Sequence, residues 1–422
     1  MSAAANGAGV PVVVTGIGVA CSIGVGVEPF AASLRAGRTG IRRQDGQVSA
    51  PLAGFDFAHA VGAVPGLPQE LSRRALRKAG RSLPAVQAAV AAALQAWTGA
   101  GLPAADLPGS QVGVVVGGNN VTGAAAYRMA ERFRGDPVAV PGRFALHVQD
   151  TDHVGVLSEI LAITGEGYTV GGAAASGNLA VIHGARMVRS GAARACLVVG
   201  AMTELSPVDR QSYLALGAMA DPAAAPDDDV LCRPFDTTRR GFVAGEGTAA
   251  LLLEAEPSAR ARGVRPLARV AGEAMALSAN SLADPSEEVE VAVMSTALAR
   301  AGARPEQLDY VNTHGTASRL GDEVEAAALR RVLGRDSGAW VNATKALTGH
   351  CLCGAGAVEA VATVVQMTHG FVHPNPHLGM PLTGELRFAG RQAEPARIGL
   401  ALSNGFGFGG LHSAVVFAGE VA

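Results

Sequence analysis

Residues 168–187 read YTVGGAAASGNLAVIHGARM, which is the pattern of a short strand, a tight turn and a helix. Gly171 and Gly172 relieve the steric limits on a sharp turn, because glycine lacks a Cβ atom. Apolar residues recur at helical spacing from about Ser176 onward. Such a turn directs backbone N–H groups and the positive end of a helix dipole at one spot, where enzymes commonly place a nucleophile. This chain has Ala174 there, so we expect a site that is built for a nucleophile and lacks one.

Strand and helix signals alternate on both sides of this turn. Strands are expected at residues 10–17, 112–116, 195–199, 248–254, 267–277, 308–312, 340–342, 398–403 and 412–417. Helices are expected at residues 27–36, 69–97, 123–134, 154–163, 285–301, 322–333 and 354–367. Alternation of this kind predicts α/β layers with a largely parallel sheet.

The second half of the chain repeats the pattern of the opening stretch. GGAAASGNLAVIHGARMV at residues 171–188 and GHCLCGAGAVEAVATVV at residues 349–365 each combine a glycine turn, a run of small residues and an apolar helix. This likeness suggests a duplicated architecture. A stretch containing Pro, Arg and Gly at residues 256–265 is the expected boundary, which divides the chain into residues 1–255 and 256–422.

Composition limits the class of protein. The 422 residues are 49% hydrophobic and 17% charged, so one large or two to three ordinary domains can bury a substantial core. A net charge of −2 without a basic block argues against a nucleic-acid partner. Five cysteines, mostly in apolar contexts, suit a reducing cytoplasm, and Cys351 and Cys353 have no second cysteine pair with which to bind zinc. No run of about 20 apolar residues predicts a membrane span.

Four polar or glycine-rich features follow in order, each at the end of an element. His314 closes a strand in NTHGT, and Glu325 comes eleven residues later. Lys345 and His350 lie five residues apart in a loop before a helix, and residues 404–410 read NGFGFGG between two strands. Each feature alone has an ordinary reading as a structural histidine, a surface lysine or a turn over a core. Their succession at element ends, where open α/β sheets place their clefts, indicates a functional site.

This succession resembles the β-ketoacyl synthases, the condensing enzymes of fatty acid and polyketide synthesis. The motifs that carry the likeness are VVVTGIGVACSIG at residues 12–24, RPFDTTRRGFVAGEG at 233–247, NTHGTASRLGDEVE at 312–325, TKALTGHCLCGAGAVEA at 344–360 and SNGFGFGG at 403–410. The resemblance implies the thiolase fold, a duplicated layered α-β-α-β-α architecture, and a homodimer.

The resemblance also implies roles for single residues. His314 and His350 take the places of the paired active-site histidines, and Lys345 and Glu325 take those of a supporting ion pair. The backbone N–H groups of Ala174 and Phe408 would form an oxyanion hole.

Further residues are implied to bind the substrate. These are Phe406, which like Phe408 falls at an aromatic position of the gating loop, together with Asn404, Thr316 and Gly407. Four positions depart from the family pattern: Ala174 replaces Cys, Gly405 replaces Ser, and Leu411-His412 replaces Thr-Asn.

Ala174 decides which chemistry remains. A condensing enzyme holds an acyl group on its Cys and decarboxylates a malonyl thioester, but alanine has no heteroatom with which to hold an acyl group. Decarboxylation requires hydrogen-bond donors at the thioester oxygen, and ring N–H groups of His314 and His350 can supply them, at about 3–4 kcal/mol for one donor. Protonation of the enolate would then give an acetyl thioester.

The sequence therefore predicts a ketosynthase-like enzyme of polyketide biosynthesis that decarboxylates malonyl-acyl carrier protein without condensation. Residues 170–178, VGGAAASGN, also resemble the free-standing decarboxylases of polyketide β-branching cassettes, which usually bear Ser at this point. Whether Ala174 is natural or replaces a parent Ser or Cys stays open. No cofactor of its own is expected beyond the phosphopantetheine arm of the carrier protein.

Two alternatives stay open. The chain could be a condensing synthase whose Cys has been replaced, or a non-catalytic partner like the chain-length subunits of active ketosynthases. Such partners commonly lose the histidines, whereas this chain keeps both. Basic residues on an early helix, Arg73, Arg74, Arg77 and Lys78, are either a solvated face or a contact for the carrier protein.

Overall fold

The computed structural model describes residues 9–225, 232–335 and 337–419, and most of their strands join one hydrogen-bonded network. The first half contributes β1 (Val12–Cys21), β2 (Gly24–Val25), β5 (Val112–Gly117), β6 (Gly167–Val170), β7 (Ala195–Gly200) and β8 (Gly247–Ala255). The second half contributes β9 (Ala268–Leu277), β10 (Tyr310–Asn312), β11 (Trp340–Asn342), β13 (Arg387–Phe388), β15 (Leu400–Gly407) and β16 (Leu411–Ala418). Short ribbons outside it are β3 (Arg42–Gln44) with β4 (Gln47–Ser49), and β12 (Phe371–Val372) with β14 (Glu394–Pro395).

The strand order repeats between the two halves. Across the first half it runs β6-β5-β7-β8-β1, and across the second β11-β10-β15-β16-β9. Numbered by chain order within each half, both read 3-2-4-5-1. In each half the fifth strand, β8 or β16, pairs antiparallel with its neighbours, and the other four run parallel to one another. The expected duplicated architecture with largely parallel sheets is therefore confirmed.

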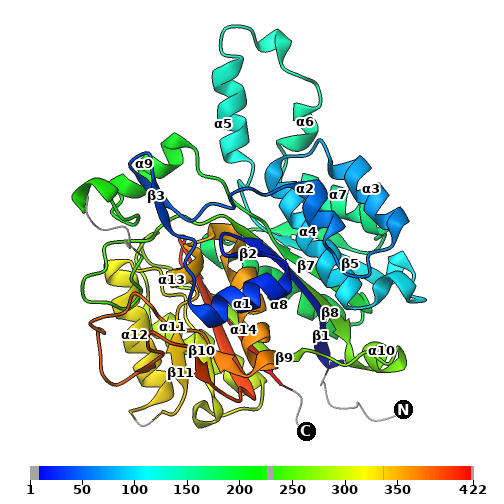
Figure 1. Ribbon diagram of the computed structural model, residues 1–422. Coiled ribbons are helices and arrows are strands. Elements are labelled where there is room, and N and C mark those ends of the chain that lie inside the picture. The colour runs from blue at the N-terminus through cyan, green and yellow to red at the C-terminus, as the bar shows by residue number, and fades with distance from the viewer. Residues whose placement is uncertain (1–8, 226–231, 336, 420–422) are drawn as a thin grey trace.

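Two equivalent helices lie between the halves (Figure 1). α8 (Ser176–Arg189) follows β6, and α14 (Ala355–His369) follows the short helix after β11, so each links the third strand to the fourth. They pack tightly, because a Cβ atom on Gly177 would lie 2.4 Å from the backbone nitrogen of Ala357. Their apolar side chains share one buried cluster with β1 and β8. This central layer places the N-terminus of each helix at the same end of the molecule.

Outer helices complete the α-β-α-β-α layers. α4 (Pro84–Gly99) covers β1 and β8, while α11 (Glu287–Arg300) covers β9 and β16 and packs on α12 (Arg319–Leu333). The remaining helices are α1 (Val27–Ala36), α2 (Phe57–Gly62), α3 (Gln69–Ala79), α5 (Gly123–Arg132), α6 (Phe144–His147), α7 (Asp152–Leu161), α9 (Pro207–Ala215), α10 (Glu256–Ala261) and α13 (Lys345–Thr348).

One predicted helix is wrong. The helix expected over residues 69–97 is two helices, α3 and α4, because the chain turns between Gly80 and Leu83. Pro84 then starts α4, where its missing N–H group costs no hydrogen bond. The boundary at residues 256–265 falls on α10 and the loop after it, and the division into residues 1–255 and 256–422 stays a prediction that the repeated strand order supports.

An arm made by α5 and α6 projects from the body of the molecule (Figure 1). It carries apolar side chains that face solvent, since Val138 is 94% exposed and Leu146 is 67% exposed. Within residues 9–225, 232–335 and 337–419, none of the helices combines the length and the apolar character needed to cross a membrane.

Candidate active site

The turn between β6 and α8 holds Ala174 at the tip of the central layer. Ala173 has a left-handed backbone, with a φ of 48°. Its N–H group donates to Oδ1 of Asn119 at 3.1 Å, and the hydroxyl of Ser176 accepts from the Gly172 N–H at 2.9 Å and donates to the Ala173 carbonyl at 2.7 Å. These bonds fix the position that a nucleophile would occupy.

Gly171 and Gly172 were expected to allow a sharp backbone turn, but the structure shows another reason for them. Neither has a left-handed φ, and Gly172 has a φ of −161°. They are required by space instead, because a Cβ atom on Gly172 would lie 2.4 Å from Cδ1 of Leu179, and one on Gly171 would lie 2.9 Å from Cβ of Asn119. Close packing against the turn, rather than backbone freedom, explains both glycines.

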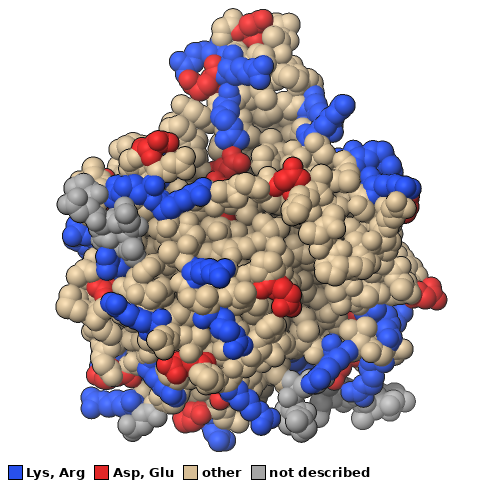
Figure 2. Space-filling view, viewed as in Figure 1, with Lys and Arg blue, Asp and Glu red and all other residues tan. Residues whose placement is uncertain are grey.

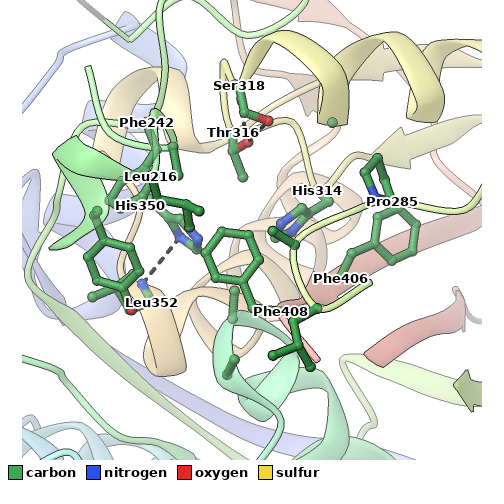
Figure 3. Close-up of a pocket in the computed structure, with 18 of the residues that line it drawn as sticks. Leu216, Phe242, Pro285, His314, Thr316, Ser318, His350, Leu352, Phe406 and Phe408 are labelled. Atoms are coloured by element: carbon green, nitrogen blue, oxygen red, sulfur yellow. Dashed lines mark hydrogen bonds between the residues drawn. The ribbon is translucent and has the colours of Figure 1, made fainter. Parts of the chain in front are cut away.

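A cavity of about 570 Å³ opens at this turn. Eight of the ten predicted site residues line it: Ala174, His314, Thr316, Glu325, His350, Phe406, Gly407 and Phe408. In Figure 3, His314 and His350 lie on either side of the cavity, with Thr316 and Ser318 above them. The remaining two, Lys345 and Asn404, are fully buried behind the wall.

His350 is held with a defined ring orientation just after α13. The backbone N–H of Leu352 donates to its Nδ1 at 3.2 Å, the dashed line in Figure 3. Because an N–H group can only donate, Nδ1 carries no proton and the proton of the neutral ring is on Nε2. Burial, and then the charge of Lys345, lower the pKa of His350 well below its usual value. His350 is therefore a neutral hydrogen-bond donor.

His314 stands at the carboxyl end of β10. Its ring lies 5.7 Å from the ring of His350, at 84°. Lys345 Nζ lies 3.5 Å from Nδ1 of His314 and donates to its carbonyl oxygen at 2.5 Å. Burial, followed by the charge of Lys345, lowers the pKa of His314 well below its usual value. With an ammonium group beside Nδ1, the ring presents its proton at Nε2.

The expected ion pair between Lys345 and Glu325 is wrong. Nζ of Lys345 pairs with Oε1 of Glu359 at 2.5 Å, and both side chains are buried. Glu325 instead accepts the backbone N–H groups of His314 and Gly315, each at 2.8 Å. It thus positions the histidine loop rather than the lysine.

Glu359 is the site residue that the sequence reasoning missed. It is the single charged residue in the apolar helix sequence AGAVEAVATVV, at residues 355–365, and a lone acid in a buried helix requires a partner. Burial raises the pKa of Glu359, and the ammonium of Lys345 opposes this by favouring the ionised carboxylate. The single acid in this apolar helix was therefore the sequence signal that could have identified Glu359 as a site residue.

Asn404 also differs from its expected role. It is fully buried and donates through Nδ2 to Oε1 of Glu325 at 3.1 Å, so it supports Glu325 and does not reach the cavity. Asp322 is a second carboxylate below the same loop, and its Oδ1 accepts the N–H groups of Thr316 and Ala317, each at 3.1 Å. Together these contacts fix the chain on both sides of the His314 loop.

The glycine-phenylalanine loop presses against the turn that bears Ala174. A Cβ atom on Gly407 would lie 2.3 Å from the Gly172 carbonyl, so only glycine fits. Phe406 lies 5.5 Å from the His314 ring, and Phe408 is 41% exposed at the mouth of the cavity. The loop therefore contributes one aromatic ring to the interior and one to the entrance.

Asn178 explains the departure at Gly405. A Cβ atom on Gly405 would lie 2.7 Å from Nδ2 and 2.9 Å from Cγ of Asn178. Asn178 is held there by a bond from Nδ2 to the Ser403 carbonyl at 3.2 Å. Its side chain fills the space that a serine at position 405 would need.

Two neutral imidazole donors facing one cavity can stabilise an oxyanion. The alanine at the turn cannot form a covalent bond to an acyl group. The site therefore suits a reaction that develops negative charge on an oxygen and needs no acyl-enzyme.

Comparisons with known proteins agree with this geometry. Residues 10–259 match the family model of the β-ketoacyl synthase N-terminal domain, and residues 267–379 match that of the C-terminal domain. The chain is 40% identical over 407 residues to the polyketide biosynthesis malonyl-ACP decarboxylase PksF of Bacillus subtilis, covering 96% of this chain and 95% of that protein. It is 30% identical over 426 residues to 3-oxoacyl-[acyl-carrier-protein] synthase 2 of Vibrio cholerae, covering 96% and 98%.

Solved structures of ketosynthases share this fold. The ishigamide ketosynthase/chain length factor superposes with a TM-score of 0.86 at 29% identity, covering 98% of this chain and 100% of that one. A type II polyketide synthase ketosynthase, AntDE, solved with its acyl-carrier protein AntF, superposes with a TM-score of 0.83 at 25% identity, covering 98% and 100%.

Proposed function

Because the chain belongs to the β-ketoacyl synthase family, we propose that it decarboxylates a malonyl group on an acyl carrier protein and releases the acetyl form without condensation. One observation carries this proposal. His314 and His350 are retained as neutral donors in a cavity where Ala174 replaces the nucleophile. The similarity to the Bacillus subtilis malonyl-ACP decarboxylase supports the same reaction.

The reaction follows from the charges that develop. The malonyl thioester enters past Phe408, and its thioester oxygen accepts from Nε2–H of His314 and of His350. The bond from the α-carbon to the carboxylate breaks, CO₂ leaves, and the electron pair forms a thioester enolate. Each N–H donor stabilises the enolate oxygen by about 3–4 kcal/mol relative to a site without it. A proton on the α-carbon then completes the acetyl thioester.

Further residues are assigned on the same basis. We assign the backbone N–H groups of Ala174 and Phe408 to a second donor pair, since Gly407 brings the loop against the turn. Thr316, whose hydroxyl lies 2.9 Å from that of Ser318, is assigned to the pantetheine arm with Phe406 and Gly407. Lys345 and Glu325 act as positioning residues for His314.

An acyl carrier protein is the proposed partner, and its phosphopantetheine arm the substrate handle. Arg73 and Arg77 on α3 are exposed and available for an acidic carrier surface. Arg74 and Lys78 are engaged, with the Ile160 carbonyl and Glu159 respectively. Figure 2 shows basic side chains over α3 and along the arm. The enzyme must meet its carrier protein, and we propose that it does so in the cytoplasm.

A homodimer is proposed as well. The arm made by α5 and α6 exposes Val138 and Leu146, which are apolar side chains that a second copy would cover. β6 ends the sheet, and its free edge offers a further contact.

The test is the release of CO₂ from malonyl-loaded carrier protein. Wild-type protein should release it and leave acetyl-carrier protein, and the double variant His314→Ala/His350→Ala should not. Equal rates in the two proteins would refute these roles. The two alternatives, a condensing synthase with a replaced Cys and a non-catalytic chain-length partner, are not favoured, since the intact histidine pair would be idle in the latter.

A further inference from the structure

Glu290 is a buried acid in the wall of the reaction cavity that the proposed mechanism has not used. It lies one turn into α11 and is buried, with 1% of its side chain exposed at the cavity. Neither of its carboxyl oxygens has a hydrogen-bond partner among the residues that the structure describes. Burying a carboxyl group without a hydrogen-bond partner costs free energy, so its presence here calls for an explanation.

His412 faces this acid from β16. Nδ1 of His412 lies 3.0 Å from the Gly410 carbonyl, which can only accept, so Nδ1 carries the ring proton. Nε2 is then an unprotonated base, and it lies 3.8 Å from Oε1 of Glu290. The ring of His412 also lies 5.1 Å from the ring of Phe406, at a tilt of 45°, and the Phe406 ring lies 5.5 Å from that of His314. The pair is therefore one aromatic ring away from the proposed donors.

The surroundings of Glu290 favour the protonated form of its carboxyl. Burial raises its pKa well above the usual range, and the nearby carboxyl groups of Glu325, Glu287 and Asp322 raise it further. Burial lowers the pKa of His412, so the histidine that faces the acid is neutral. These shifts favour the uncharged form of each group, a carboxylic acid beside an imidazole base.

We propose that Glu290 is the acid that protonates the enolate carbon, with His412 as its base partner. This inference rests on the proposed decarboxylation. The enolate π electrons form the new C–H bond with the Glu290 proton, the oxygen returns to a carbonyl, and Glu290 is left as a carboxylate. Water entering the cavity restores its proton, so the overall reaction consumes one proton from solvent.

The chemistry explains why such an acid belongs here. A condensing enzyme must keep its carbanion unprotonated until it attacks the acyl group, whereas a decarboxylase must protonate it. The β-ketoacyl synthase pattern places Asn where this chain has His412, so the base partner of Glu290 is one of the departures already seen in the sequence.

The test compares Glu290→Gln with the wild-type protein on malonyl-carrier protein. Loss of the acid should lower kcat by about 100-fold and leave KM within about twofold, as expected when a general acid is removed. Wild-type kcat should fall at alkaline pH as Glu290 ionises, and this fall should be absent in Glu290→Gln. Glu288→Gln, on the solvent side of the same helix and paired with Arg331, is the matched control and should keep the wild-type profile.

Two further variants separate chemistry from folding. Glu290→Ala should regain activity when formic acid is added, a rescue that a structural role would not give. His412→Asn should shift the alkaline fall to lower pH, because the imidazole lone pair that favours the protonated form of Glu290 is gone. Unchanged kcat and an unchanged pH profile in Glu290→Gln would overturn this inference alone. A wild-type protein that releases no CO₂ would overturn the proposed function together with it.

Discussion

The backbone N–H of Leu352 donates to Nδ1 of His350 at 3.2 Å, and this bond decides which ring nitrogen of His350 can serve the substrate. Nε2 carries the proton of the neutral ring. The proposed chemistry requires this tautomer, because a thioester oxygen that gains charge needs a donor and not a lone pair.

The first prediction concerns the two donors. His350→Ala and His314→Ala should each lower kcat for CO₂ release by about 10²–10³-fold, since each removes one donor from the developing oxyanion. His59→Ala, an exposed histidine on α2, should leave the rate unchanged. A single-histidine variant with wild-type kcat would mean that its ring does not contact the thioester oxygen.

The second prediction concerns pH and stability. The pKa of His350 in the folded protein lies well below the value near 6.5 expected in the unfolded chain, so below pH 6.5 the unfolded state takes up a proton that the folded state does not. As the pH is lowered below 6.5, the free energy of unfolding should therefore decrease relative to that of His350→Gln. The slope should approach about 1.4 kcal/mol per pH unit.

Comparison with this variant cancels opposing groups such as Asp322, whose pKa burial raises to about 7 and which favours the folded state as pH falls. Urea unfolding of both proteins between about pH 7 and 5 measures the difference. A constant difference across this range would contradict the neutral histidine.

The third prediction concerns the buried pair of Lys345 and Glu359. Lys345→Met should lower the free energy of unfolding by about 3–5 kcal/mol, because it leaves the Glu359 carboxylate buried without a counter-charge. Adding Glu359→Gln should recover most of that loss. The exposed pair of Arg330 and Glu385 is the control, and Arg330→Met should cost less than about 1 kcal/mol. Equal losses at the two sites would argue against an ionised buried pair.

The fourth prediction concerns Gly405 and Asn178. Gly405→Ser should lower the free energy of unfolding by about 1–3 kcal/mol, because its side chain would overlap Asn178. Asn178→Ala should restore stability in the Gly405→Ser background, and thermal unfolding of the four proteins measures the coupling. Purely additive effects would show that the two positions do not share this space.

The sequence predicted most of the fold because hydrophobic period and turn residues act locally. α1 was predicted with its observed bounds, and the repeated pattern around the two central helices matches their equivalent places in the two halves. The break between α3 and α4 was missed although Gly80 and Pro84 mark it in the sequence, because helix-forming residues continue on both sides of it. The reason for Gly171 and Gly172 was missed because it depends on Asn119 and Leu179, which only the folded chain brings near.

The candidate site was predicted less completely. Eight of the residues predicted from the motifs line one cavity. The pairing of Lys345 with Glu359 was not predicted, because it depends on where α14 lies in space. Asn404 was assigned to the substrate although its side chain supports Glu325. Glu290 belongs to no motif, and it became visible only as a buried carboxyl beside His412 that has no hydrogen-bond partner among the described residues.

The central claim is decarboxylation without an acyl-enzyme, and intact mass spectrometry of carrier protein and enzyme together tests it most directly. Malonyl-carrier protein should convert to acetyl-carrier protein while the mass of the wild-type enzyme stays unchanged. Ala174→Cys is the matched comparison and should gain an acyl adduct from an acyl-loaded carrier. Malonyl-carrier protein that persists for hours beside the wild-type enzyme, as it does without enzyme, would contradict the account.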